Sequence, residues 1–209
     1  MKYLLASAVA ALAVTGFSAN AATNLVTNGS FEATTQAAGT WNIYSSLPGW
    51  TSGPRGVELR NDVAGSAFDG NNFIELDTTG NSFIAQAIAT SFGEHYTLSF
   101  SYSARPGTAS LGAHSNDILV MWGLKPITLL SATNATSEHQ WSTYSFDVTG
   151  SYGHSTVLSF WALGKSDTHG GSLDNISLTT PVPEPETYAL MLGGLAALGM
   201  VARRRRQPR

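Results

Sequence analysis

Hydrophobic and polar residues alternate strictly in several short stretches of this chain, most clearly over residues 96–103. Tyr96, Leu98, Phe100 and Tyr102 share one side of this stretch, and Thr and Ser residues occupy the other. Successive side chains of a β-strand point to opposite faces, so this pattern predicts a strand with one buried face. Residues 141–148 and 156–162 alternate in the same way. Further strands are expected at residues 73–76, 82–88, 118–122 and 172–178.

Clusters of Gly, Asn and Pro separate these stretches and favour turns, at residues 69–71, 105–107 and 170–171. Between residues 22 and 181 no stretch repeats its apolar residues with the helical period. Many short strands joined by turns predict an all-β fold, a two-sheet antiparallel β-sandwich, for one domain over residues 22–181.

Residues 1–21 differ from this domain because they contain a continuous apolar run. They begin with Lys2, continue with an apolar stretch from Leu4 to Phe17, and end in Ala19-Asn20-Ala21. A positive charge, a short apolar helix and small residues at the last and third-last positions predict a secretory signal peptide. We expect cleavage after Ala21.

Residues 182–209 combine a spacer rich in Pro and Glu, an apolar run and a cluster of arginines. The fifteen uncharged residues from Tyr188 to Ala202 would form a helix of about 22 Å. A bilayer core is about 30 Å thick, and arginine side chains reaching the head groups help to close the difference. The pattern predicts a C-terminal transmembrane helix with its arginines in the cytoplasm.

The order of these elements resembles the PEP-CTERM sorting signal of Gram-negative bacteria. The matching residues are Pro183, Glu184, Pro185, Arg203, Arg204, Arg205 and Arg206. The resemblance implies export, transient anchoring in the inner membrane, recognition by an exosortase-type membrane protease and removal of the tail. It also implies delivery to the cell surface or to the extracellular matrix of a biofilm. The alternative is a plain C-terminal anchor.

Charge and cysteine content narrow the possible partners of the domain. Residues 22–181 contain five basic and twelve acidic residues, which leaves a formal charge of −7. An acidic domain repels phosphate backbones, so we expect no nucleic-acid partner and favour calcium or a neutral sugar. The chain has no cysteine, which excludes disulfides, thiol catalysis and cysteine-ligated zinc.

The domain also resembles the galactose-binding-like jelly rolls, which include DUF642-type domains and carbohydrate-binding modules related to families 4, 9 and 22. The resemblance rests on Asn28-Gly29-Ser30-Phe31-Glu32 near its start and on Leu173-Asp174-Asn175-Ile176 near its end. Pro48-Gly49-Trp50 and the strand patterns between them add to it. It implies a two-sheet jelly roll, often with a structural calcium ion near the chain ends.

Glu32 and Asp174 are the candidate metal ligands. Asp174 shares parity with Ile176 and Leu178, which are expected to face the core. A carboxylate at the rim of a core is unfavourable unless it is paired or bound to a metal. The resemblance places both carboxylates where related modules hold calcium, with backbone carbonyls completing the oxygen shell. Alternatively, both accept backbone N–H groups in loops, and Asn28 either adds a ligand or only favours a turn.

Trp161 is the leading candidate for ligand binding. Its parity is opposite to that of Leu158, Phe160 and Ala162, so we expect its ring on the outer face of the sheet. An exposed ring can stack on the apolar face of a sugar, whereas a loop that covers the ring is the alternative. Trp41, in an expected loop, is the next candidate.

The remaining tryptophans and the glycine-rich loop are assigned mainly to the fold. Trp50 and Trp122 are expected in the core. Residues 167–171 are expected to form a turn that requires two glycines, and the alternative is the rim of a ligand groove.

Catalysis has little support in the sequence. Glu58, Glu75 and Asp77 are the only acids whose pattern suggests a glycosidase pair, and such acids are exposed by default. The five histidines form no metal or triad signature. We therefore expect a non-enzyme.

Two functions remain open. The first is a module that binds extracellular polysaccharide, and the second is a structural or self-associating matrix protein without a sugar site. Two or more exposed aromatic residues in a groove would favour the first, and a flat polar surface the second.

Overall fold

The computed structural model describes residues 22–112, 114–181, 191–196 and 198–199 of the chain. Residues 22–181 form one compact unit, and the residues before and after them are grouped in a second. The signal-peptide prediction and most of the sorting tail, including all seven motif residues, lie outside the described residues. Within the tail, residues 191–196 are helical.

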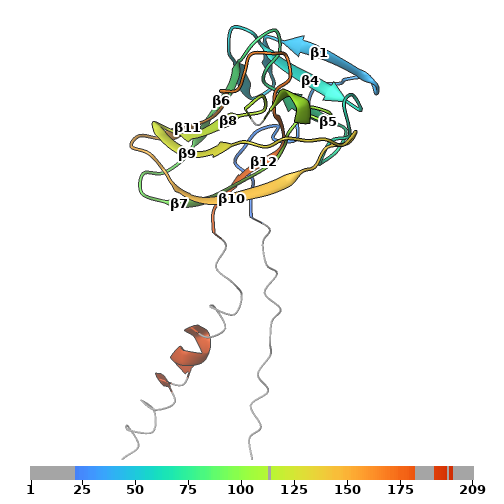
Figure 1. The fold of residues 1–209 in the computed structure, drawn as a ribbon. Helices are drawn as coiled ribbons and strands as arrows, with labels where there is room; N and C mark the ends of the chain where they lie inside the picture. The colour runs from blue at the N-terminus through green and yellow to red at the C-terminus, as the bar shows by residue number, and fades with distance from the viewer. Residues whose placement is uncertain (1–21, 113, 182–190, 197, 200–209) are drawn as a thin grey trace, which may run out of the picture. The chain divides into compact units, whose positions relative to one another are not determined.

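Two antiparallel six-stranded sheets make up residues 22–181 (Figure 1). The first has the order β1-β4-β5-β12-β7-β10, and the second β2-β3-β6-β11-β8-β9. The strands of the first sheet are β1 (Thr40–Tyr44), β4 (Val57–Asn61), β5 (Asn72–Glu75), β12 (Ser172–Thr179), β7 (His95–Ser103) and β10 (Ser142–Thr149). Those of the second are β2 (Ser46–Leu47), β3 (Trp50–Ser52), β6 (Phe83–Ala89), β11 (Ser155–Ala162), β8 (Ile118–Trp122) and β9 (Lys125–Leu130). The predicted all-β sandwich is confirmed.

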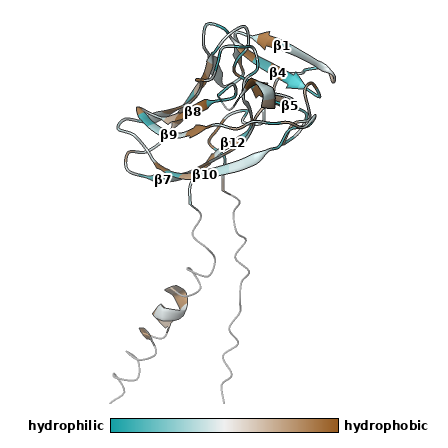
Figure 2. Ribbon diagram, in the orientation of Figure 1, coloured by the Kyte–Doolittle hydropathy of each residue, from teal (hydrophilic) through white to brown (hydrophobic). Residues whose placement is uncertain are grey.

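The core lies between the sheets and is filled by the alternating apolar residues of both. On β7, Leu98 and Phe100 are fully buried, and on β11, Leu158 and Phe160 are fully buried. Hydrophobic and hydrophilic residues are accordingly interspersed along the strands in Figure 2. Trp50 and Trp122 are buried as expected. Burial of apolar side chains at about 25 cal/mol per Å² is the main stabilising term of such a core.

All seven predicted strands are present, with ends shifted by at most one or two residues. The alternation did not indicate β1, β2, β3, β4 and β9. Of these, β2 and β3 have only two and three residues, and β9 contains Pro126 and is largely exposed. Trp41 lies in β1, so its assignment to a loop was wrong. Tertiary pairing with a stronger neighbour, here β4 for β1, created these strands.

A β-bulge in β12 overturns the predicted orientation of Asp174. The register against β7 shifts between Asp174 and Ser177, and Asn175 adopts a left-handed φ of 49°. The extra residue reverses the alternation, so Asp174 pairs with Ser101 on the outer face of the sheet. Asp174 therefore does not share a face with Ile176 and Leu178, although it is fully buried by a loop.

The bulge also receives the start of the domain. The Leu25 amide donates to the Leu178 carbonyl, and the Ile176 amide donates to the Gly29 carbonyl. A Cβ atom at Gly29 would lie 1.9 Å from the Ile176 carbonyl oxygen. This close approach explains why glycine stands in the Asn28-Gly29-Ser30 segment.

Candidate functional site

Glu32 and Asp174 hold the same loop, residues 68–72, from two sides. Glu32 Oε1 accepts hydrogen bonds from the amides of Asn71 and Asn72, at 2.8 and 2.7 Å. Asp174 Oδ2 accepts from the amides of Phe68 and Asp69, both at 2.8 Å. The structure thus displays the loop-capping arrangement for both carboxylates. Burial raises the pKa of Asp174 to about 7, against the lowering effect of these amides.

Asn28 serves the same region through its side chain. Its amide oxygen accepts from the Ala33 amide at 3.0 Å, and its amide nitrogen donates to the Pro48 carbonyl at 3.0 Å. Its φ of 56° fits the turn that the sequence indicated. Among the described residues, no group of three or more His, Asp or Glu side chains is arranged to hold a metal ion. Calcium at Glu32, Asp174 and Asn28 stays a prediction.

Trp161 lies on the outer face of the second sheet, as its parity predicted. Its side chain is 39 % exposed, and its indole N–H donates to Ser159 Oγ at 2.8 Å. One face of the ring stacks on Phe83, with centroids 4.2 Å apart. Trp161 lines an open groove of about 810 Å³, the outer groove, together with Phe92, Leu124, Tyr152 and Val157. Lys125 is the only charged residue among the groove's described lining residues.

Trp41 lines a different depression, of about 320 Å³, on the outer face of the first sheet. We call it the Trp41 pocket. Its lining residues are Trp41, Ile43, Glu58, Arg60, Val63, Thr78, Thr79, Arg105, Thr168 and His169. The indole is 47 % exposed, and the guanidinium of Arg60 lies over it, 5.5 Å from the ring centroid. Such a contact holds the ring in one orientation by cation–π attraction.

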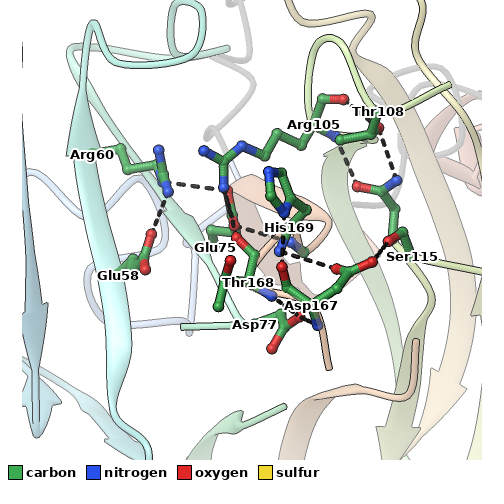
Figure 3. A network of polar contacts seen from close by, with 12 residues as sticks. Glu58, Arg60, Glu75, Asp77, Arg105, Thr108, Ser115, Asp167, Thr168 and His169 are labelled. Carbon is green, nitrogen blue, oxygen red and sulfur yellow. Dashed lines mark hydrogen bonds and ion pairs between the residues drawn. The ribbon is translucent and has the colours of Figure 1, made fainter. Parts of the chain in front are cut away.

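A buried ionic network forms the floor of the Trp41 pocket (Figure 3). Arg60 donates through Nη2 to Glu58, and its Nε lies 3.3 Å from Glu75 Oε2. Arg105 Nη1 donates to Glu75 Oε1 at 3.0 Å. The network follows from strand pairing, because Glu58 of β4 lies directly opposite Glu75 of β5. Arg60 Nη1 is buried and has no hydrogen-bond partner among the described residues.

A third carboxylate, Asp77, fixes the loop that forms one wall of the Trp41 pocket. Its Oδ2 accepts from the amides of Asp167 and Thr168, at 2.8 and 2.9 Å. Arg105 Nη1 donates to the Thr168 carbonyl, and the Gly170 amide donates to Glu75 Oε1 at 3.0 Å. Thr168 and His169 of this loop line the pocket, which fits the groove-rim alternative, and the requirement for two glycines that the sequence indicated also holds. Gly170 is required here, since a Cβ atom would lie 2.6 Å from the Asp77 amide nitrogen.

Burial strongly affects the ionisation of this network. It raises the pKa of Glu75 to about 7, although Arg60 and Arg105 act in the opposite direction. Burial also raises the pKa of Asp77. Glu58, Glu75 and Asp77 are all buried, so the expectation that these acids are exposed was wrong. They hold arginines and loop amides, because a buried carboxylate is unfavourable without such partners.

The sequence indicated the residues of this pocket only in part: His169 lies in the segment 167–171 that was weighed as a groove rim, whereas Arg60 and Arg105 were not selected. Arg60 carried the one available signal, because Val57 and Leu59 alternate with Glu58 and Arg60 over residues 57–60. Arg105 lies in a turn and His169 in a loop, each far along the chain from Trp41. Only the fold brings them together.

The C-terminal segment of the chain is similar to a known sorting motif. Residues 181–206 match the PEP-CTERM protein-sorting motif. The tail is a PEP-CTERM sorting signal. This signal indicates an exported protein that is transiently anchored in a membrane. Of the helices that the structure describes, none has the length and apolar character to cross a membrane.

The chain resembles several solved structures in fold. The Stig cyclase Fisc from Fischerella sp. TAU, in complex with (3Z)-3-(1-methyl-2-pyrrolidinylidene)-3H-indole, has a TM-score of 0.56 and 15% identity. That match covers 78% of this chain and 100% of the cyclase. TmCBM61, in complex with β-1,4-galactotriose, has a TM-score of 0.51 and 12% identity, over 76% and 99% of the two chains. Curated protein sequences gave no match.

These likenesses show that the domain shares the β-sandwich fold of carbohydrate-binding modules. The same fold also supports the cyclases, which are enzymes. Fold alone therefore does not assign a reaction or a ligand, because both depend on the side chains of a particular site.

Proposed function

We propose that the exported domain binds a neutral or weakly charged extracellular polysaccharide, and that the Trp41 pocket is the binding site. The observation that carries this proposal is the combination of an exposed indole with two guanidinium groups, a carboxylate and an imidazole around one cavity. An aromatic face stacks on the apolar face of a sugar, and planar polar groups bind its hydroxyls. The cavity volume lies at the lower end of the range of about 300–1,000 Å³ for ligand pockets.

The two arginines of the pocket differ in their access to a ligand. Nη1 of Arg60 is buried without a hydrogen-bond partner among the described residues, and an unpaired buried donor is costly unless a water molecule satisfies it. Arg105, whose side chain is 20 % exposed, is the guanidinium that a sugar hydroxyl can reach. Trp161 is the weaker candidate because the outer groove contributes one charged side chain and otherwise hydroxyl and apolar groups.

We also propose that binding is non-catalytic. A glycosidase needs two carboxyl groups that reach the scissile bond from either side. Glu75 is 0 % exposed, and both Glu58 and Glu75 pair with Arg60. Both acids are thereby held in ion pairs with Arg60. Glu75, in addition, has no exposed surface that a substrate can contact. Incubation with a bound polysaccharide should release no shorter saccharides.

Affinity electrophoresis against a panel of purified exopolysaccharides tests the proposal. Loss of a stacked ring costs about 1–3 kcal/mol, so Trp41→Ala should weaken binding about 5- to 150-fold. Trp161→Ala is the matched control, because it removes an equally large, half-exposed ring from the other sheet, and it should bind like the wild type. Unchanged melting of both variants would show that they are folded.

The outcomes separate the alternatives. If Trp161→Ala loses binding and Trp41→Ala does not, the site lies in the outer groove. If no polysaccharide in the panel retards the wild type, the structural or self-associating matrix protein becomes the leading function.

A further inference from the structure

Three loops at one end of the sandwich expose large apolar side chains. They are residues 90–94 between β6 and β7, the β8–β9 turn at Gly123 and Leu124, and residues 150–154 between β10 and β11. Leu124 is 96 %, Tyr152 90 % and Phe92 70 % exposed. We call these three residues the tip cluster.

The loops that carry the tip cluster support one another. The Gly93 amide donates to the Gly150 carbonyl at 3.1 Å, and the Gly150 amide donates to the Glu94 carbonyl at 2.9 Å. The rings of Phe92 and Tyr152 meet edge to face, with centroids 5.7 Å apart. All three tip residues line the outer groove. The cluster thus gathers three exposed apolar side chains around one groove at one end of the domain, and exposed apolar patches mark interaction sites.

The domain ends on the same side as the tip cluster. Strand β12 runs antiparallel to β7, and its last residue, Thr179, pairs with Thr97 near the start of β7. The loop that bears Phe92 immediately precedes β7, and Thr149, which pairs with His95, immediately precedes the loop that bears Tyr152. The chain therefore leaves the sandwich through Pro181 at the end where these loops lie.

The sorting signal limits how far this end can be from a membrane. Six residues, 182–187, separate Pro181 from Tyr188, where the apolar run begins. Six residues span at most about 20 Å. Eight residues, 180–187, separate the last residue of β12, Thr179, from Tyr188, so while the tail is anchored the end of β12 stays within about 30 Å of the start of the apolar run.

We propose that the tip cluster inserts into the interfacial region of the lipid bilayer while the sorting tail is still attached. Tyrosine and phenylalanine favour the boundary between water and hydrocarbon, and leucine favours the hydrocarbon beneath it. The anchored tail keeps the domain close to the bilayer, so the tip cluster meets the membrane at a high effective concentration. Three side chains therefore suffice for membrane contact without a high intrinsic affinity. Lys125, next to Leu124, faces the phosphates of the head groups. This role is independent of glycan binding at the Trp41 pocket, which lies on the other sheet.

Because the chain has no cysteine, a single introduced cysteine gives a unique labelling site. Leu124→Cys and Tyr152→Cys are labelled with an environment-sensitive fluorophore, in the chain with its tail in place. Each is reconstituted in phosphatidylcholine nanodiscs that hold one chain, with and without nitroxide-labelled lipid. Ser110→Cys is the control, since Ser110 lies exposed in a 3-10 turn after the opposite end of β7.

The labels at 124 and 152 should show blue-shifted emission and loss of fluorescence with the nitroxide lipid, and the label at 110 should show neither. Emission at 124 and 152 equal to that at 110 would overturn the proposal. A blue shift that nitroxide lipid does not quench would also overturn it, and would indicate that protein covers the tip cluster.

Discussion

Arg60 is the residue on which the Trp41 pocket depends, because its guanidinium group contacts three other residues in and below the pocket. It pairs with Glu58 beside it on the same strand, approaches Glu75 on the next strand and lies over the Trp41 ring. Removing one partner of a buried ion pair leaves an uncompensated charge, which costs about 3–5 kcal/mol. Glu75 forms ion pairs with both Arg60 and Arg105, and it thereby connects strands β4 and β5 to the segment at residue 105.

The ionisation of Glu75 predicts how stability depends on pH. Its pKa rises from 4.5 to about 7 on folding, so the folded protein holds this proton more tightly than the unfolded chain does. The resulting stabilisation is complete below pH 4.5 and is lost as the pH rises through about 7. Wild-type protein should therefore lose unfolding free energy over this range.

Glu75→Gln isolates this contribution, because glutamine cannot ionise. Chemical unfolding at several pH values should show a smaller decline for the variant than for the wild type. The difference between the two proteins should develop between pH 4.5 and 7. His139, whose pKa burial lowers to about 4, acts with the opposite sign between pH 4 and 6.5, but it is present in both proteins and cancels in their difference. Parallel curves for the two proteins would contradict the raised pKa of Glu75.

Among the elements, β12 joins the start and the end of the domain. Its bulge at Asn175 receives the segment that contains Gly29, and Asp174 holds the loop at residues 68 and 69. Glu32, which follows that first segment, holds residues 71 and 72 of the same loop. One loop is thus shared by residues from both ends of the domain. These carboxylate oxygens are ligands of the type that calcium prefers.

We predict that calcium bound by Glu32 and Asp174 stabilises this junction. An ion that binds only the folded state stabilises it by about 2.7 kcal/mol at a hundredfold excess over Kd. Calcium should then raise the melting temperature by several degrees relative to chelator. Asp174→Ala should abolish that increment, whereas Asp147→Ala, which removes an exposed carboxylate from β10, should retain it. Identical wild-type melting curves in calcium and chelator would exclude the site.

At the scale of the whole molecule, a folded domain is followed by a sorting signal and preceded by the segment that is predicted to be a signal peptide. The PEP-CTERM signal covers residues 181–206 and begins directly after the domain. Few residues therefore remain between the last strand and the apolar run. We infer that this short connection keeps the end of the domain near the membrane surface while the tail is attached.

We predict that the mature exported protein begins at Ala22 and ends near Pro183 or a few residues beyond it. Exosortase-type processing would remove the apolar run together with the arginines. Intact-mass measurement of the exported protein checks both ends, and a variant with Pro183, Glu184 and Pro185 replaced by alanine serves as the unprocessed control. A mature species that keeps Arg203 to Arg206 would indicate a permanent anchor instead.

The sequence by itself determined the features that depend on local periodicity and on contiguous motifs. Alternation located β7, β10 and β11 and placed Trp161 on the outer face, because side-chain direction in a strand follows residue parity. The sorting signal was equally readable, since its residues follow one another in the chain. Both kinds of feature need only neighbouring residues.

Only the tertiary structure decided the features that depend on pairing between distant segments. The bulge at Asn175 reversed the parity of Asp174, and pairing with β4 converted the segment of Trp41 into a strand. Arg60, Arg105 and His169 converge on one cavity although they are far apart in the chain. Sequence periodicity contains no distances between strands, so neither the Trp41 pocket nor the burial of Glu75 could be derived before the sheet was assembled.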